Sequence, residues 1–370
     1  MIQNKNLILD GHKLEWHKDR LGAWQAGERI APITIDCALT RACNLRCVYC
    51  YGQLQANDEL RITRDVIYRF LDDAAEIGVK AISFVSDGES TCSPYLYDAI
   101  RRGNENGLDM ALGTNGILLD PEMLPEILPA LTYLRFNISA GEPERYAQIH
   151  GCAESMFEKA CEIIKESVKV RNKLKLETMI GLQMVLMPEF EDQVIPLAKL
   201  GRNLQADYLV IKHCSDDENG SLGVKYDKYF ELEDLLKEAE TLSDDNYLVR
   251  AKWSKILSQG KRKYSQCYGP AFIMQFSGSG MVAPCGMLFN KNYSKFHIGN
   301  IAEASFKEIW QSQRYQTVLN DISSKNFDAK TMCGTLCLQH KVNEYLWDLK
   351  QEGKKFESPA TQKPFGVNFI

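Results

Sequence analysis

Three cysteines close together in the sequence form the clearest chemical motif of this chain. Cys43, Cys47 and Cys50 stand in the pattern Cys-x3-Cys-x2-Cys. Three thiolates at this spacing can bind three corners of a cubane iron–sulfur cluster and leave the fourth iron without a protein ligand. A metal centre with an open position can do chemistry, whereas a closed centre is usually structural or carries electrons. A zinc knuckle and a disulfide scaffold are the alternative interpretations of such a run.

Length, charge and cysteine content narrow the class of protein to which this motif belongs. The chain has 370 residues, a formal net charge of −5 and 12 cysteines. This size predicts one large domain with a smaller one, and the negative charge disfavours a nucleic-acid partner, which needs a basic surface. No run approaches the ~20 apolar residues of a transmembrane helix, and the first residues lack the apolar region of a secretion signal. We therefore expect a cytoplasmic, metal-binding protein without a membrane or nucleic-acid partner.

Strands and helices alternate along the chain, and the cysteine motif directly follows the first strand. Short apolar runs predict strands at residues 33–37, 81–85, 108–113, 133–139, 180–187 and 207–212. Helical spacing of apolar residues predicts helices at residues 63–77, with Thr63 as N-cap, and at 94–103, 121–128, 155–170 and 190–200. Six strand–helix units predict parallel strands with right-handed crossovers and an active site at the carboxyl ends of the strands. The cysteine motif falls at that end.

The cysteine run, with Tyr49 as the aromatic residue before the last cysteine, resembles the signature of the radical S-adenosylmethionine (SAM) superfamily. The resemblance implies an α/β fold with a partial (β/α)6 TIM-like barrel. It also implies a 4Fe–4S cluster whose open iron binds the amino and carboxylate groups of SAM. An electron from the cluster then cleaves SAM to methionine and a 5′-deoxyadenosyl radical, which abstracts a hydrogen atom from an unactivated carbon. Such an enzyme needs an external one-electron reductant such as flavodoxin or ferredoxin.

Further strand ends resemble the SAM-binding motifs of that family. The segment at residues 86–90 resembles a Gly-Gly-Glu-Pro element, in which the glutamate, here Glu89, binds the SAM ammonium. Asp87 replaces a glycine and Ser90 replaces the proline, so an ordinary acidic turn is the alternative interpretation. The full set of residues that the resemblance assigns to SAM is Tyr49, Asp87, Gly88, Glu89, Ser90, Asn115, Asn137, Ser139, Gln183 and Met184. A plain core role is the alternative for Met184.

A second group of four cysteines lies in the C-terminal third: Cys267, Cys285, Cys333 and Cys337. A glycine-rich turn between apolar runs predicts a β-hairpin at residues 272–284, which would bring the first two together. The group resembles the SPASM/Twitch extension of radical SAM enzymes, in its shorter form with one auxiliary 4Fe–4S cluster. A Gly-Asn-Ile segment at residues 299–301 and an Ile-Trp pair at 309–310 strengthen the resemblance, whereas the final Cys-x3-Cys departs from the usual Cys-x2-Cys. A zinc site with four cysteines is the alternative, because four thiolates suit zinc equally well.

These features predict five segments. We expect an N-terminal extension that packs on the barrel (residues 1–32), the barrel (33–215), a helical linker (216–266), the auxiliary cluster domain (267–340), and a C-terminal helix and tail (341–370). The polar stretch at residues 215–223 is the predicted boundary after the barrel.

The end of the sixth strand supplies the catalytic candidates Lys212, His213 and Cys214. Lys212 or His213 would act as general base and Cys214 as hydrogen-atom donor; a structural histidine and a buried apolar cysteine are the alternatives. The leading hypothesis is a radical SAM oxidoreductase that oxidises a hydroxyl of a sugar- or cyclitol-like small molecule, with the auxiliary cluster as electron acceptor. One alternative is a peptide-modifying radical SAM enzyme that forms a crosslink or an epimer. The other is a non-catalytic iron–sulfur or zinc module.

Overall fold

A single ten-stranded sheet forms the centre of the computed structural model, which describes residues 6–57, 60, 62–356, 359 and 362–370. Its strands are β1 (Thr34–Cys37), β2 (Ala81–Phe84), β3 (Asp109–Thr114), β4 (Leu131–Asn137), β5 (Met179–Leu186), β6 (Tyr208–His213), β7 (Leu248–Ala251), β8 (Ile273–Phe276), β9 (Met281–Ala283) and β10 (Gly299–Asn300). Their order in the sheet is β10-β9-β8-β1-β2-β3-β4-β5-β6-β7. Strands β1 to β7 run parallel, so the expected partial barrel is confirmed.

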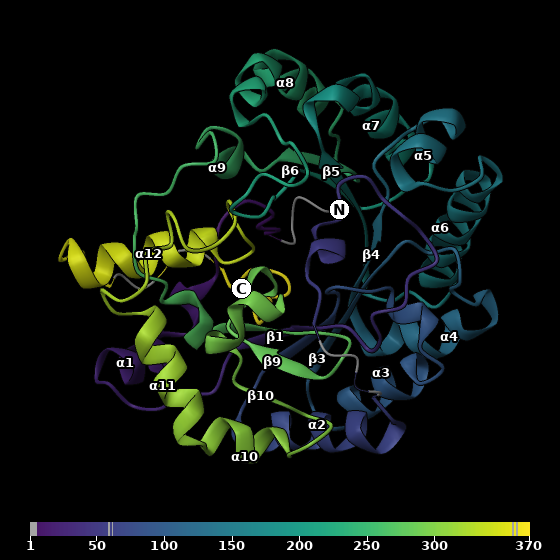
Figure 1. The fold of residues 1–370 in the computed structure, drawn as a ribbon. Helices are drawn as coiled ribbons and strands as arrows, with labels where there is room; N and C mark the ends of the chain where they lie inside the picture. Colours follow the sequence, from purple (N-terminus) through teal and green to yellow (C-terminus); the bar gives the residue numbers. More distant parts are fainter. Residues whose placement is uncertain (1–5, 58–59, 61, 357–358, 360–361) are drawn as a thin grey trace.

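Helices surround this sheet in a ring, as Figure 1 shows. Their bounds are α1 (Lys18–Gln25), α2 (Arg64–Ile77), α3 (Leu96–Glu105), α4 (Leu124–Ile127), α5 (Pro143–His150), α6 (Ser155–Lys173), α7 (Val194–Asn203), α8 (Glu233–Thr241), α9 (Trp253–Ile256), α10 (Phe306–Gln311), α11 (Gln313–Ile322) and α12 (His340–Gln351). The predicted N-cap is confirmed, because the Thr63 hydroxyl accepts a hydrogen bond from the Val66 N–H. The sheet is not closed, since β7 and β10 lie at its two edges.

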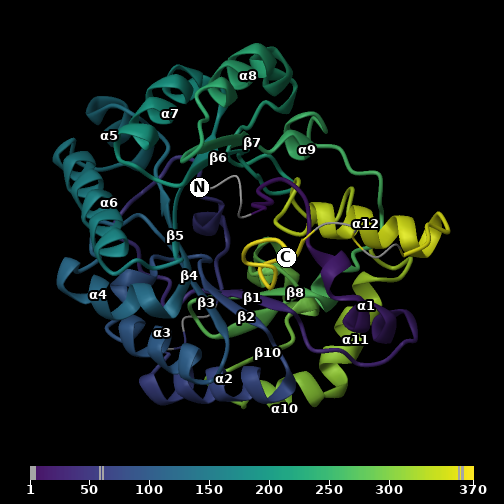
Figure 2. The ribbon, with the colours of Figure 1, turned by 180° about the vertical axis from the view of Figure 1, so that it is seen from behind.

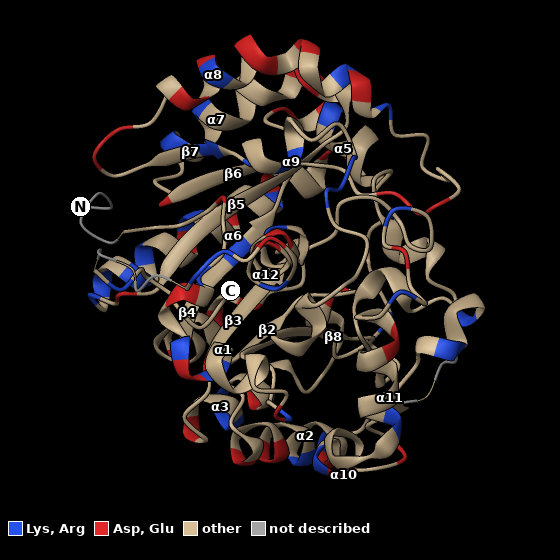
Figure 3. Ribbon diagram, turned by 90° about the vertical axis from the view of Figure 1, so that its left-hand side faces the viewer, with Lys and Arg blue, Asp and Glu red and all other residues tan. Residues whose placement is uncertain are grey.

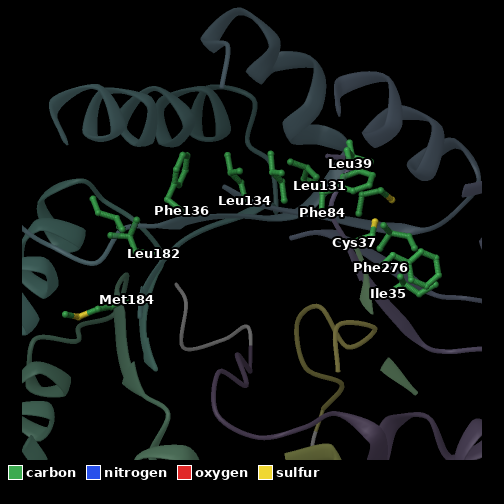
Figure 4. Packing of buried hydrophobic residues seen from close by; sticks show 14 of the residues in the cluster. Ile35, Cys37, Leu39, Phe84, Leu131, Leu134, Phe136, Leu182, Met184 and Phe276 are labelled. Atoms are coloured by element: carbon green, nitrogen blue, oxygen red, sulfur yellow. The ribbon is translucent and has the colours of Figure 1, made fainter. Parts of the chain in front are cut away.

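Side chains alternate between two environments along each barrel strand. One set, which includes Leu134, Phe136 and Leu182, packs against the surrounding helices (Figure 4). The other set faces the lumen of the barrel. Acidic and basic residues lie along outer helices such as α2 and α8 (Figure 3), but several lumen positions also carry charge.

The structure corrects three details of the expected architecture. The predicted helical linker, residues 216–266, contains β7, a seventh strand that pairs with β6 and extends the barrel. Helix α5 lies between β4 and α6, where no helix was predicted. The β8–β9 hairpin is present, but β8 also pairs in parallel with β1, so the auxiliary segment continues the barrel sheet.

The two ends of the described chain close the barrel at the amino ends of its strands, and both lie near the centre of the ring in Figure 2. The Lys13 ammonium donates hydrogen bonds to the carbonyls of Gly366 and Phe369, each at 2.9 Å. Nearby, Leu21 of α1 and Leu346 of α12 are buried in one apolar cluster. The C-terminal helix therefore packs within the same chain, against the N-terminal segment. Among the described residues, none of the helices is sufficiently long and apolar to cross a lipid bilayer.

Candidate active site

Helix α5 supports the loop that carries Cys43, Cys47 and Cys50. The N–H groups of Arg46 and Val48 donate hydrogen bonds to the last carbonyls of the helix, those of His150 (3.0 Å) and Ile149 (2.9 Å). Gly151 then ends the helix in the left-handed conformation, with φ of +61°. A Cβ at position 151 would lie 2.6 Å from the Arg46 carbonyl oxygen, so only glycine allows the loop to approach so closely. The C-terminal end of α5, a helix that was not predicted from the sequence, thus supports the first cysteine motif through backbone hydrogen bonds.

His150 contacts the cysteine loop through its side chain. Its Nε2 accepts a hydrogen bond from the Ser139 N–H at 3.1 Å, and its Nδ1 lies 3.2 Å from Cys47 Sγ. Burial lowers the pKa of His150 to about 3, so the ring is neutral and its one proton is on Nδ1. The Nδ1–H therefore donates to the Cys47 sulfur. Sequence reasoning missed this residue, since nothing local distinguishes it from any other histidine at a helix end.

A His150→Phe variant is expected to lower the midpoint potential of a cluster bound at Cys47. Hydrogen bonds to cluster sulfurs stabilise the reduced state, and their loss makes reduction harder. A difference of about 1.4 kcal/mol corresponds to roughly 60 mV for one electron, which is the size of shift we expect. Spectroscopic redox titration of the reconstituted protein measures it, with His12→Phe, at the far end of the barrel, as control. An unchanged potential in the His150 variant would contradict the assignment.

Glu89 joins the cysteine loop to two strand ends. Its Oε1 accepts hydrogen bonds from the Thr91 N–H and hydroxyl and from the Thr114 hydroxyl, and its Oε2 accepts one from the Asn115 N–H at 2.8 Å. The Glu89 N–H donates to the Ala42 carbonyl in the loop. A carboxylate offers about four lone pairs, so one lone pair of Oε2 is left for a further donor. This is the geometry that binding of an ammonium group requires.

Asp87 and Gly88 connect the cysteine loop to the C-terminal hairpin. Asp87 accepts hydrogen bonds from the Ser277 hydroxyl (2.5 Å) and from the Gly278 N–H (2.8 Å) in the β8–β9 turn. A Cβ on Gly88 would lie 2.0 Å from the Thr40 carbonyl oxygen, and a Cβ on Gly278 would lie 2.1 Å from the Thr40 carbonyl carbon. The peptide after Thr40 is therefore held between two glycines. Asp87 connects these segments of the chain, and Arg41 Nε lies 3.4 Å from its Oδ2.

The remaining polar residues that were predicted to bind SAM make hydrogen bonds at strand ends or lie buried near them, whereas Met184 faces another environment. The Gln183 amide donates to Asn137 Oδ1 at 2.9 Å, and the Ser139 hydroxyl accepts from the Val185 N–H at 3.1 Å, so these strand ends form one polar surface. The hydroxyl of Ser90 is buried without a hydrogen-bond partner among the described residues, and the Asn115 amide donates to Asn44 in the cysteine loop. Met184 differs: it points away from the lumen into the core beneath the helices (Figure 4). This placement does not support an adenine contact for Met184.

The three catalytic candidates at the end of β6 occupy different environments. Lys212 faces the lumen, where its electrostatic neighbours are Arg135, Lys252 and Asp36. His213 faces outward and packs against the rings of Tyr226 and Tyr229, so its placement does not support a role as base in the lumen.

Cys214 is completely buried next to the cysteine loop. Its Sγ lies 3.6 Å from the Tyr49 carbonyl oxygen, and burial raises the pKa of its thiol to about 12. A thiol with so high a pKa keeps its proton at neutral pH. Cys214 therefore carries the S–H bond that a hydrogen-atom donor needs.

The four C-terminal cysteines, Cys267, Cys285, Cys333 and Cys337, line one cavity. The Asn343 amide donates to Cys267 Sγ at 3.2 Å. Burial by itself would lower the pKa of Arg262, but Cys333, Tyr264 and Cys337 around it raise that pKa above its ordinary value. A buried cavity with four sulfurs, an amide donor and a cation suits an anionic thiolate centre.

Tyr51 lies between the two cysteine groups and was not singled out from the sequence. A Cβ on Gly286, next to Cys285, would lie 2.7 Å from the Tyr51 hydroxyl. Burial raises the pKa of Tyr51, and Cys285, Asp87, Cys50 and Asp36 raise it further. These neighbours place one side chain beside the first cysteine motif, the second motif and the lumen.

Comparisons with known proteins agree with this geometry. Residues 38–200 match the model of the radical SAM superfamily, and residues 267–337 match the SPASM model, an iron-sulfur cluster-binding domain. The chain is a radical SAM enzyme with a SPASM domain. Its relatives include the tungsten-containing aldehyde ferredoxin oxidoreductase cofactor-modifying protein of Pyrococcus furiosus, 24% identical, with 75% of this chain and 80% of that protein covered. The AdoMet-dependent heme synthase of Methanosarcina barkeri is 26% identical, with 84% and 90% covered.

A solved structure shows the same fold as this radical SAM enzyme. It is SuiB of Streptococcus suis bound to its precursor peptide SuiA, with a TM-score of 0.63 and 15% identity, covering 84% of this chain and 71% of that chain. At this identity the likeness concerns the fold.

The cofactors of this radical SAM enzyme are a 4Fe–4S cluster with SAM and an auxiliary iron–sulfur centre. The residues present fit them. We propose that Cys43, Cys47 and Cys50 would hold the first cluster, that Glu89 would bind the SAM ammonium, and that the four cysteines of the C-terminal cavity would hold the auxiliary centre. The SPASM match specifies iron and sulfur and so argues against the zinc alternative. The radical SAM match argues against the non-catalytic module.

Proposed function

We propose that the protein is a radical SAM oxidoreductase that converts a hydroxyl of a sugar- or cyclitol-like substrate to a carbonyl. The observation that carries the proposal is the four-cysteine cavity. Four thiolates satisfy all four irons of a cubane cluster and leave no position for substrate, so a centre there can exchange an electron but cannot bind the substrate. A dedicated electron acceptor is what an alcohol oxidation requires.

The atoms and electrons of this reaction balance. When bound, the first cluster and SAM would supply the radical chemistry that removes a hydrogen atom from the carbinol carbon, and the four C-terminal cysteines would hold the centre that accepts the second electron. The hydroxyl proton must leave as well, and Lys212 Nζ is the group that we assign to accept it. An external reductant such as flavodoxin or ferredoxin would supply the initiating electron.

The survey that tests this proposal uses the anaerobically reconstituted enzyme with SAM, dithionite and a panel of polyols and amino sugars. We expect 5′-deoxyadenosine and a product that has lost two hydrogen atoms, in equal amounts, measured by mass spectrometry. Products of unchanged mass from every substrate that is turned over would contradict an oxidation.

Lys212 gives the proposal a pH signature. Burial, with Arg135 and Lys252 nearby, lowers the pKa of Lys212 to about 8, so its neutral, proton-accepting form increases as the pH rises through 8. We expect product formation to rise over this interval in the wild type, and to fall by roughly 100-fold or more in Lys212→Met. The pH–rate profile measures both. A Lys212→Met variant with the wild-type profile would remove Lys212 from the mechanism.

A peptide-modifying reaction is the second candidate, and Cys214 is the observation that favours it. Its protonated thiol lies against the cysteine loop, where it could return a hydrogen atom to a substrate radical in an epimerisation. Cys214→Ala would then abolish product formation and leave SAM cleavage intact. In the oxidation that we propose, the same variant keeps its product.

A further inference from the structure

Four charged side chains lie in the lumen of the barrel: Asp36 on β1, Arg135 on β4, Lys212 on β6 and Lys252 directly after β7. Asp36, Arg135 and Lys252 line one cavity. Both Asp36 and Lys212 have the other cations of the group as electrostatic neighbours. Three cations and one carboxylate give this lumen group an excess of two positive charges when all are ionised.

None of these side chains has a salt-bridge or hydrogen-bond partner in the described part of the chain, and Arg135 Nε is buried without one. Arg171, on helix α6 outside the lumen, differs from these cations because it makes an ion pair of 2.6 Å with Asp207. The three cations are only half-buried, so their charged groups can still reach solvent or a ligand in the lumen. Like charges held close together repel one another, and stability alone does not explain three of them in one lumen.

Arg135 borders open space in the cavity that Asp36 and Lys252 also line. The strands on both sides of Arg135 carry glycine at the same level, Gly113 on β3 and Gly181 on β5. Neighbouring side chains fill the room at both glycines, because a Cβ at position 113 would lie 3.1 Å from Val85 and a Cβ at position 181 would lie 2.0 Å from the ring of Tyr208. A ligand would therefore reach the guanidinium through the cavity and not through the glycine positions.

The electrostatics of the group agree with a missing counter-charge. Burial raises the pKa of Asp36 to about 7, although Arg135, Lys212 and Lys252 oppose the rise. Burial also lowers the pKa of Lys252, as does the neighbouring Arg135. Asp10 and Asp36 both oppose the fall in the pKa of Lys252, whereas Asp36 is the neighbouring carboxylate that Arg135 and Lys212 share.

We propose that Arg135 and Lys252 form a subsite for an acidic group of the substrate, a carboxylate or a phosphate. A guanidinium binds either group through two parallel hydrogen bonds, and the ammonium supplies a second cation. The proposal rests on the proposed function only in that the lumen receives the substrate. Asp36 is an electrostatic neighbour of Tyr51, the residue that follows Cys50. An acidic group bound beside Asp36 would therefore lie in the lumen below the first cluster.

Calorimetric titration of the reconstituted protein tests the subsite, with saturating SAM present to occupy its own site and with constant ionic strength. The probes are inorganic phosphate and succinate, and neutral succinamide is the control ligand. We expect at least one anion to bind the wild type and succinamide not to bind. The Arg135→Gln/Lys252→Met double variant should bind that anion roughly tenfold more weakly or worse. Phosphate binding alone indicates a phosphorylated substrate, and succinate binding alone indicates a carboxylated one.

A matched control removes the same charge elsewhere. Lys159→Met/Lys199→Met deletes two positive charges from exposed positions on α6 and α7 and should bind like the wild type. No binding by the wild type, or equal weakening in both double variants, would overturn the proposal. Should the lumen double variant fail to fold, the single variants Arg135→Gln and Lys252→Met decide in the same way. The product masses from the polyol and amino-sugar panel report on the oxidation independently of anion binding, so failure of the subsite and failure of the proposed function are distinguishable.

Discussion

A variant with Cys43, Cys47 and Cys50 all replaced by alanine is expected to retain about four irons per chain and to lose all 5′-deoxyadenosine formation. The three substitutions remove every cysteine ligand that we assign to the SAM-binding cluster. They leave the C-terminal cavity intact, because none of its four cysteines belongs to the substituted loop. Iron content after anaerobic reconstitution measures the effect directly.

The complementary variants make this experiment decisive. Replacing all four C-terminal cysteines should also leave about four irons, now with SAM cleavage retained. Cys161→Ala, at a buried position on α6 outside both cysteine groups, should keep the iron content of the wild type. If no iron remains in the first variant, the C-terminal cavity holds no cluster. The electron-acceptor argument then fails, and a redox-neutral reaction such as epimerisation becomes the better proposal.

Gly88→Ala is expected to abolish SAM cleavage and to destabilise the protein by on the order of 3 kcal/mol. The added Cβ would lie 2.0 Å from the Thr40 carbonyl oxygen, and the peptide cannot retreat because Gly278 approaches it from the other side. Relief requires the backbone at residues 40–41 to move, and that backbone leads directly into the cysteine loop. Denaturant unfolding and 5′-deoxyadenosine assays measure the two effects.

Gly22→Ala is the matched control for this substitution. Gly22 lies in helix α1, has no heavy atom within 4 Å of an added Cβ, and should gain up to about 1 kcal/mol of stability from the better helix former. Gly278→Ala should reproduce the defect of Gly88→Ala, because it acts on the same peptide. Normal SAM cleavage by Gly88→Ala would mean that the cysteine loop does not depend on this packing.

Local patterns in the sequence were sufficient to predict the parallel strands of the barrel and to recognise the two groups of cysteine ligands. The parallel strands 33–37 to 207–212 were predictable because short apolar runs and intervening helical periodicity are properties of neighbouring residues. The two cysteine groups were recognisable because ligand type and spacing are local as well. Strand β7 was missed because four residues with only two buried positions carry too weak a pattern.

The contacts between distant segments were decided only by the tertiary structure. His150 meets Cys47 across 103 positions, and Asp87 meets Ser277 across 190. A strand's period of two shows that Lys212 and His213 face opposite sides, but the closing of the barrel determines which of them faces the lumen. The same closing gathers Arg135 and Lys252 around one cavity. Sequence alone determined which residues could do chemistry here, whereas packing decided which of them meet, because apolar patterns specify each element and not the partner against which it packs.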